Sequence, residues 1–359
     1  MEKFKLNLIA LTALMVFFCG QQTSEDRLST CINYAMKHTM SSVNTGAKPS
    51  GKSALGSVKL TSKTGETTPN KYGRNWPVLS SSPRGLVFMT KTVPDKTRDR
   101  QVLQVMADES KLSKVYESGD VSRYFTAETE GLLLIGEENK LVEIDLEKDV
   151  RRELYVAPKS GTYPLVEVPK VEVPEVLGEY RIICRIGGLG GKVSLIDTKK
   201  GKLIYELDAD YWAISGDKKR MITGNLKEKL KLVDPVNGNV LSEFGEPIEK
   251  RISQIVLNQD GSKFAMGLGG DLIIADIEKG LSQTLVGGFM DVPSIEFSSN
   301  SKWLAWGTLG RIVWIWDLKK NQVRDVVGVG GNVSGLAFVG NTLFAADASF
   351  ICWEFSIEG

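Results

Sequence analysis

Residues 282–320 read SQTLVGGFMDVPSIEFSSNSKWLAWGTLGRIVWIWDLKK. This stretch divides into four segments with apolar residues at their centres: SQTLVGG, DVPSIEFSSNS, KWLAWGTLG and RIVWIWDLKK. Glycine, serine, asparagine and lysine separate the apolar runs, and such residues form the tight turns between short strands. The stretch therefore predicts four β-strands within about 40 residues.

The same unit recurs along the chain from about residue 76. In five copies an apolar strand ends on an aspartate, and a turn rich in lysine, glycine and asparagine follows. These residues are Asp145, Asp197, Asp234, Asp276 and Asp317. Two further copies, at 100–110 and 349–359, lack the aspartate. Seven units of four strands predict an all-β fold, namely a seven-bladed β-propeller with four-stranded antiparallel blades.

A family resemblance supports this prediction. The order of the elements and the sequence IWDL at 315–318 resemble the WD40-type repeat family, and residues 190–207 and 230–244 resemble the quinoprotein-type propeller repeat. The resemblance covers roughly residues 76–359 and implies a propeller that serves as a binding platform. Only one unit keeps the Trp-Asp pair, and the Gly-His pair of the WD family is absent.

The last blade needs a strand from elsewhere in the chain. The seventh unit reaches Gly359 directly after its third strand. A blade that is one strand short exposes a sheet edge. We expect the alternating segment GSVKLTSK at 56–63 to supply the missing strand.

The first eighteen residues have the pattern of an export signal. Two lysines precede an apolar run at 6–18, which is shorter than the roughly 20 residues that span a bilayer. The run stops at Cys19, and this arrangement resembles a bacterial lipoprotein signal, in the looser form of spirochaetes that accepts Phe18 before the cysteine. The resemblance implies removal of residues 1–18 and lipid attachment at Cys19. Ordinary secretion and an uncleaved anchor are the alternatives.

Residues 19–70 are expected to connect the lipid to the propeller of residues 71–359. Apolar residues on one helical face predict a short amphipathic helix over 24–40. The stretch 41–70 is rich in serine, threonine, glycine and lysine, which is the composition of a flexible linker.

Composition and motifs argue against several kinds of site. The 45 Lys and Arg residues against 44 Asp and Glu leave no basic excess for nucleic acid. The only histidine, His38, lies outside the propeller, which argues against a Ser-His-Asp triad or histidine-bound zinc there. We therefore predict no enzyme activity, no metal and no cofactor.

The glycine cluster GGLGG at 187–191 is interpreted as a turn. A phosphate-binding loop opens a helix, whereas a strand pattern follows this cluster and its counterparts at 267–271 and 307–311. Glycine is expected to supply the positive φ angles of these hairpins. The strand-end aspartates occur once per blade, so we expect them to accept N–H bonds of the following turns rather than to converge on a metal.

The long interval between Asp145 and Asp197 contains YPLVEVPKVEVPEVLGEY at 163–180. Proline favours extended chain, and loops often carry contacts. The residues of this candidate contact loop are Tyr163, Pro164, Pro169, Lys170 and Pro174. A plain connector is the alternative.

Cys184 and Cys352 lie in apolar, strand-like runs. We expect them to be buried free thiols that act as small hydrophobic residues. A bridge from Cys31 to a partner chain remains open.

These features predict a non-enzymatic, exported propeller that is lipid-anchored to the outer membrane, on its periplasmic face or at the cell surface. Its partner would be another protein, either an envelope component or an external ligand. The alternatives are a central channel that binds a small molecule or carries an enzyme site, and a surface lipoprotein that binds host molecules. Converging carboxylates or an aromatic-lined funnel in the channel would favour the small-molecule alternative.

Overall fold

The computed structural model describes residues 58–64, 79–81, 87–92, 100–106, 111–118, 121–127, 132–137, 139–145, 148–157, 171–178, 181–186, 192–268, 271–279, 281–285, 292–349 and 351–357. Within these residues the chain forms 28 β-strands and no helix. The strands build seven four-stranded sheets, and the paired neighbours run antiparallel. The prediction of an all-β fold made of antiparallel four-stranded sheets is therefore confirmed.

Six sheets use consecutive strands, and they are numbered here in chain order. The first contains β2 (Leu79–Ser81), β3 (Val87–Thr92), β4 (Arg100–Met106) and β5 (Lys111–Ser118). The second contains β6 (Val121–Ala127), β7 (Leu132–Glu137), β8 (Lys140–Asp145) and β9 (Val150–Val156). The third contains β10 (Val171–Gly178), β11 (Arg181–Ile186), β12 (Lys192–Asp197) and β13 (Lys202–Asp208).

The fourth sheet contains β14 (Tyr211–Ile214), β15 (Met221–Gly224), β16 (Leu230–Val233) and β17 (Val240–Phe244). The fifth contains β18 (Ile252–Leu257), β19 (Lys263–Leu268), β20 (Asp271–Asp276) and β21 (Leu281–Leu285). The sixth contains β22 (Ser294–Phe297), β23 (Trp303–Gly307), β24 (Ile312–Asp317) and β25 (Gln322–Gly328).

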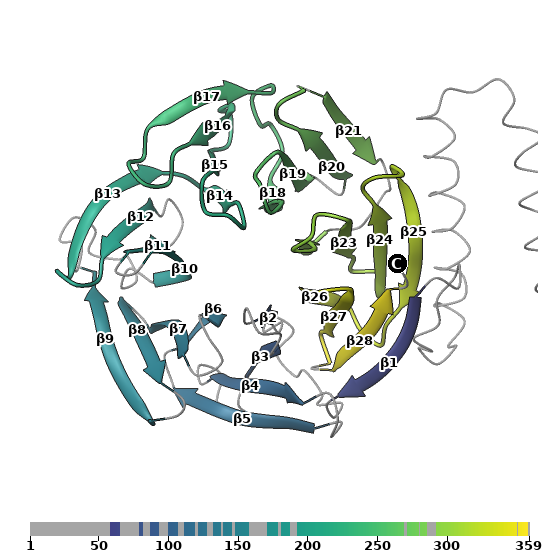
Figure 1. Cartoon of the computed structure of the whole chain (residues 1–359), viewed down its shortest axis with the longest axis horizontal. Coiled ribbons are helices and arrows are strands. Elements are labelled where there is room, and N and C mark those ends of the chain that lie inside the picture. Colours follow the sequence, from purple (N-terminus) through teal and green to yellow (C-terminus); the bar gives the residue numbers. More distant parts are fainter. Residues whose placement is uncertain are drawn as a thin grey trace, which may run out of the picture.

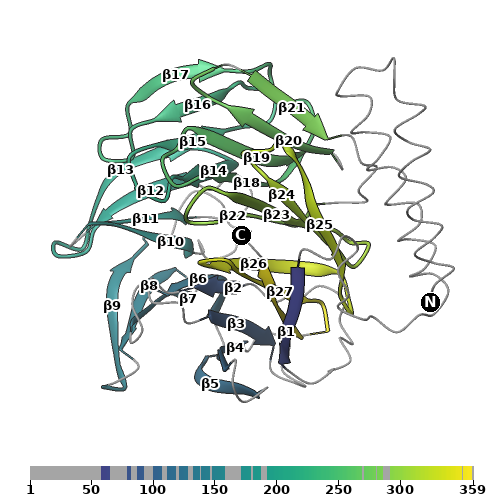
Figure 2. The same ribbon diagram turned by 45° about the vertical axis from the view of Figure 1, so that its right-hand side comes forward.

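The seventh sheet joins the two ends of the described chain. It contains β26 (Val333–Val339), β27 (Thr342–Asp347), β28 (Cys352–Ile357) and β1 (Val58–Thr64). The strand expected at 56–63 is therefore present as β1, and it pairs antiparallel with β28. Both views show β1 along the outer side of this sheet (Figures 1 and 2). The pairing covers an edge of β28 that would otherwise carry free backbone groups.

Figure 1 shows the seven sheets side by side around a common centre. Strands β2, β6, β10, β14, β18 and β26 lie nearest this centre, and β5, β9, β13, β17, β21, β25 and β1 lie at the periphery. In the sixth sheet, β22 is the edge strand opposite the peripheral strand β25. Strands β14, β18, β22, β26 and β2 contact one another in succession, as do β2, β6 and β10. These innermost strands are therefore the elements that place side chains near the centre.

Apolar side chains fill the spaces between neighbouring sheets. The cluster between the fifth and sixth sheets contains Trp306 and Trp314, whose rings stack with centroids 5.8 Å apart. Similar clusters join the sixth sheet to the seventh, the second to the third, the third to the fourth, the fourth to the fifth, and the seventh to the first. Because neighbours cover both faces of the sixth sheet, all six residues of β24 are buried, and its sequence IVWIWD is an almost continuous apolar run.

Several predicted features lie outside the described residues. They are the signal at 1–18, the lipid-attachment residue Cys19, the helix at 24–40 and most of the linker at 41–70. In the part of the chain that the structure does describe, no helix is long and apolar enough to cross a membrane.

Candidate functional site

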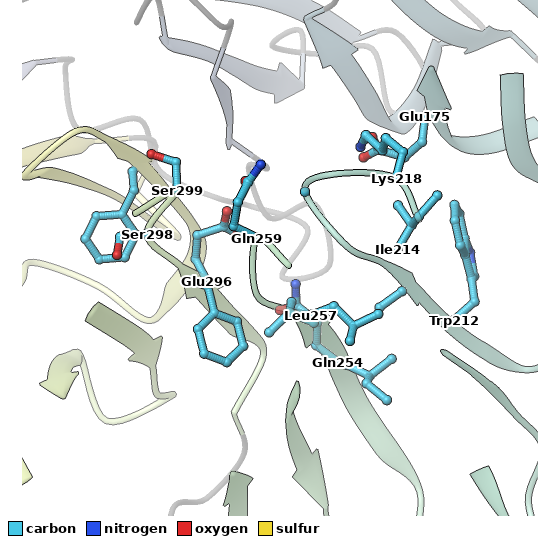
Figure 3. A pocket seen from close by; sticks show the side chains of 16 residues that line it. Glu175, Trp212, Ile214, Lys218, Gln254, Leu257, Gln259, Glu296, Ser298 and Ser299 are labelled. Carbon is cyan, nitrogen blue, oxygen red and sulfur yellow. The ribbon is translucent and has the colours of Figure 1, made fainter. Parts of the chain in front are cut away.

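A cavity of about 370 Å³ opens among the innermost strands of five successive sheets (Figure 3). Its polar lining includes Glu175 of β10, Lys218 of the β14–β15 turn, Gln254 of β18 and Glu296 of β22. Trp212 of β14 adds an aromatic surface. The central strands of this fold therefore bring together residues that are more than a hundred positions apart in the sequence.

Two of the charged residues in the cavity form an ion pair. The ammonium group of Lys218 lies 2.6 Å from a carboxylate oxygen of Glu175, and Figure 3 shows these two side chains pointing toward each other. Lys218 has a left-handed backbone with φ of 60°, and its N–H donates to the carbonyl of Ser215. The tight turn thus directs the lysine toward the third sheet, so that its charge is already neutralised by a neighbouring strand.

Glu296 is the second carboxyl group in the described lining of the cavity. It is partly buried, and within the described residues its side chain makes no hydrogen bond or ion pair. Burial and, to a smaller extent, the nearby charge of Glu175 raise the pKa of Glu296, and Lys218 opposes the rise; together they bring this pKa to about 8. In the empty cavity this carboxyl group is therefore mostly protonated at neutral pH.

Gln254 fixes the wall beside Glu296. Its side-chain oxygen accepts the backbone N–H of Ile295 at 2.8 Å, and this bond crosses from the fifth sheet to the sixth. The amide nitrogen of Gln254 donates to no other residue in the described part of the chain, so it is available at the cavity surface. A ligand there would meet a donor and a carboxyl group side by side.

The chemistry of the cavity is that of binding. Two carboxyl groups, one ammonium group, two glutamine amides and aromatic residues can hold a small polar molecule. In the described ranges, no group of three or more His, Cys, Asp or Glu side chains is placed to hold a metal ion.

The structure places the five strand-end aspartates on five different sheets, where they lie at the ends of β8, β12, β16–β17, β20 and β24. The Oδ1 atom of each one accepts a backbone N–H of the following turn at 2.8–3.1 Å. Lysines of the same turns lie at 2.7–3.7 Å from the carboxylates of Asp145, Asp197 and Asp276, and Lys263 of β19 also pairs with Asp276. The aspartates therefore stabilise separate turns and do not form a common site.

The expected contact loop at 163–180 is partly a strand. Tyr163, Pro164, Pro169 and Lys170 lie outside the described residues, but Pro174 lies in β10, so its placement in a loop is wrong. The β10–β11 register shifts between Glu172 and Glu175, and a bulge of this kind accommodates a proline that cannot donate to the ladder. The next residue, Glu175, lines the cavity.

The glycine-containing turns are followed by strands, as expected. Residues 187–191 lie outside the described residues, and β20 and β24 follow the turns at 267–271 and 307–311. In the turn at 307–311, however, the left-handed residue is Arg311 with φ of 61°. The expectation that glycine takes this position is therefore wrong for that turn.

Both described cysteines are buried free thiols, as predicted. Burial raises the pKa of the Cys184 thiol to about 12 and also raises the pKa of the Cys352 thiol. Neither sulfur is therefore a reactive nucleophile at neutral pH.

The analysis of the repeats missed the buried residue Asp347 at the end of β27. Its carboxylate accepts N–H groups from Ser349 and Ile351 and from the indole of Trp353. Asp347 ends β27, whereas the five aspartates of the repeat lie at the ends of the strands that correspond to β28. The repeat pattern therefore did not indicate it. Its role is to close the turn between β27 and β28 and to satisfy a core indole.

An apolar patch, which the sequence analysis also missed, lies on the outer strands of the third and fourth sheets. It consists of exposed residues of β13, of β17 and of the turn before β17: Leu203, Ile204, Val236, Val240 and Leu241. The hydroxyl group of Tyr205 donates to the carbonyl of Pro235 at 2.6 Å, which holds β13 against that turn. The patch therefore crosses from one sheet to its neighbour.

Comparison of the chain with protein-family models and with curated protein sequences gave no match.

Proposed function

We propose that the chain is a seven-bladed β-propeller, exported and anchored by lipid on Cys19 in the bacterial cell envelope, where it binds another protein through its outer rim. Seven four-stranded sheets around a common centre support the propeller. The apolar run before Cys19 supports export and anchoring.

The apolar patch on β13 and β17 carries the proposal of protein binding. Val240 and Leu241 are 52% and 57% exposed. Exposed apolar residues that gather on one part of a folded protein mark interaction surfaces. The corresponding outer strand of the sixth sheet, β25, buries Val326 and Val327 instead, so such exposure is not shared by every outer strand.

Backbone groups add to the apolar surface. Both β13 and β17 are the last strands of their sheets, and each is hydrogen-bonded to only one neighbouring strand of its sheet. An edge strand offers N–H and C=O groups to an added strand, and apolar side chains give such a pairing its affinity. The partner is therefore a protein that presents an apolar, extended segment to this rim.

Site-specific cross-linking tests the proposal. A photo-reactive amino acid at position 241 should capture a defined protein in intact cells, and the same group at Leu226 should not. Leu226 is a matched control because it is also an exposed leucine, at 44%, but lies on the turn between β15 and β16.

A second variant makes the result specific. Ile204→Asp, on the neighbouring strand of the patch, should abolish the capture from position 241 because it places a charge in the interface. Capture that is equal at both positions, or that survives Ile204→Asp, would contradict binding at this rim. Anchoring is tested separately by intact mass spectrometry of the wild type and Cys19→Ser, since only the wild type should carry a lipid-sized mass.

A further inference from the structure

The described lining of the central cavity holds one more carboxyl group than ammonium groups. Its lining contains two carboxyl groups and one ammonium group, and Lys218 is already paired with Glu175. Glu296 has no partner among the described residues, although a carboxylate placed away from water is costly unless an opposite charge or a donor satisfies it. An ionised Glu296 would therefore leave the cavity one positive charge short, and this carboxyl group keeps its proton at neutral pH.

Among the described residues that line the cavity, no further positive charge lies beside Glu296. The charged groups that face it are Glu175 of β10 and Lys218 of the β14–β15 turn. The lining residues contributed by β18 and β26 are uncharged. A cation from solution would thus meet an uncompensated carboxyl group, whereas an anion would face two carboxyl groups and a lysine that is already engaged.

The shape and the other lining groups favour an organic cation. A volume of about 370 Å³ lies at the lower end of the range for small-molecule sites. Trp212 offers an aromatic surface that attracts both cations and apolar carbon, and Gln254 offers an amide N–H. A bare metal ion finds no set of three acidic, histidine or cysteine ligands in the described residues.

We propose that the cavity binds a small protonated amine, with the ammonium group against the carboxylate of Glu296 and the carbon skeleton against Trp212. This inference does not depend on protein binding at the rim, because the cavity lies on the innermost strands and the patch on the outermost strands.

Proton release distinguishes binding to an ionised Glu296 from binding that does not involve this carboxyl group. The Glu296 carboxyl group is mostly protonated in the empty cavity, because burial raises its pKa. An arriving ammonium group stabilises the ionised form, so binding at neutral pH should release a proton. The measured binding enthalpy should then differ between phosphate and HEPES buffers, neither of which contains a primary amine.

The experiment is isothermal titration calorimetry of the full chain with phenethylamine and with its uncharged analogue 2-phenylethanol. The amine should bind at least about tenfold more tightly than the alcohol, and only the amine should show a buffer-dependent enthalpy. Glu296→Gln should weaken amine binding about ten- to hundredfold, remove the buffer dependence and leave the alcohol unaffected.

Control variants keep the result interpretable. Glu246→Gln removes an exposed carboxylate that does not line the cavity, so it should leave amine binding unchanged. A thermal melt of Glu296→Gln establishes that the variant is folded. Equal binding of amine and alcohol, no binding of either, or amine binding that survives Glu296→Gln would each overturn the proposal. Agmatine and a lysine-containing peptide are titrated in the same way. Tighter binding of agmatine indicates a free amine as the ligand, and tighter binding of the peptide indicates a lysine side chain.

Discussion

Replacing Gly307 with alanine tests how closely the sixth and seventh sheets approach each other. Gly307 is the last residue of β23, and a β-carbon at this position would lie 2.2 Å from Cγ1 and 2.5 Å from Cβ of Val333. Non-bonded carbon atoms pack at about 3.5–4.0 Å, so the alanine would require a movement of more than about 1 Å. Val333 is fully buried, and its N–H donates to the carbonyl of Thr308 at 3.3 Å. Val333 therefore has little room to move.

The expected loss follows from two opposing effects. Overpacking of a core costs about 1–3 kcal/mol, and replacing glycine with alanine in extended chain returns roughly 0.5–1 kcal/mol through the unfolded state. Gly307→Ala should therefore lower the free energy of unfolding by about 1–2 kcal/mol. Urea unfolding followed by tryptophan fluorescence measures this quantity as a lower midpoint at an unchanged slope.

Gly328→Ala is the matched control for this measurement. Gly328 also ends a strand of the sixth sheet, β25, but a β-carbon there would meet nothing within 4 Å. This variant should be as stable as the wild type or slightly more stable. If the two variants unfold at the same urea concentration, the close approach of Gly307 to Val333 does not exist in solution.

Three further predictions concern individual side chains. A hydrogen bond from Lys263 lowers the pKa of Asp276 to about 2, whereas an unfolded aspartate has a pKa of roughly 3.9. The ionised carboxylate therefore stabilises the folded state fully above about pH 4, and this stabilisation is lost as the pH falls from about 4 to 2. Asp276→Asn should flatten this loss in urea titrations. Maleimide should label Cys184 and Cys352 in denaturant but not in the native protein, as peptide mass spectrometry would show, because both are buried. Asp347→Ala should lower the free energy of unfolding by about 3 kcal/mol in the same urea assay, because three N–H donors lose a buried acceptor.

The strands could be predicted because their signals are local. The run IVWIWD at 312–317 is apolar at every position but one, and the structure buries all six residues of β24. The alternation in 56–63 likewise indicated the strand that pairs with β28. Pro174 was misplaced because a proline in a single sequence signals a loop, whereas its actual setting depends on a partner strand and a register shift at β10.

The residues that line the cavity could not be predicted from local sequence patterns. Glu175, Lys218 and Glu296 come from three different sheets, and only the arrangement of the sheets brings them together. One local signal was present, because Glu296 lies between the apolar residues Ile295 and Phe297 of β22. A carboxylate in such a run is a candidate functional residue, since its burial needs a compensating partner. The apolar patch gave no signal, because exposed and buried valines look alike in a sequence.

The burial of residues changes from the centre of the molecule to its periphery, and this explains where the cavity and the apolar patch lie. The cavity lies at the inner edges of the sheets, and the patch lies at the outer edges. The middle strands have neighbours on both faces and on both sides, so β24 has no exposed position. The innermost strand β14 is partly exposed at all four positions, and the outermost strand β17 is exposed at four of its five. Residues of the middle strands are constrained by packing and cannot change without a cost in stability. Side chains that serve binding are therefore confined to the central strands, where the amine cavity forms, and to the rim, where the apolar patch forms.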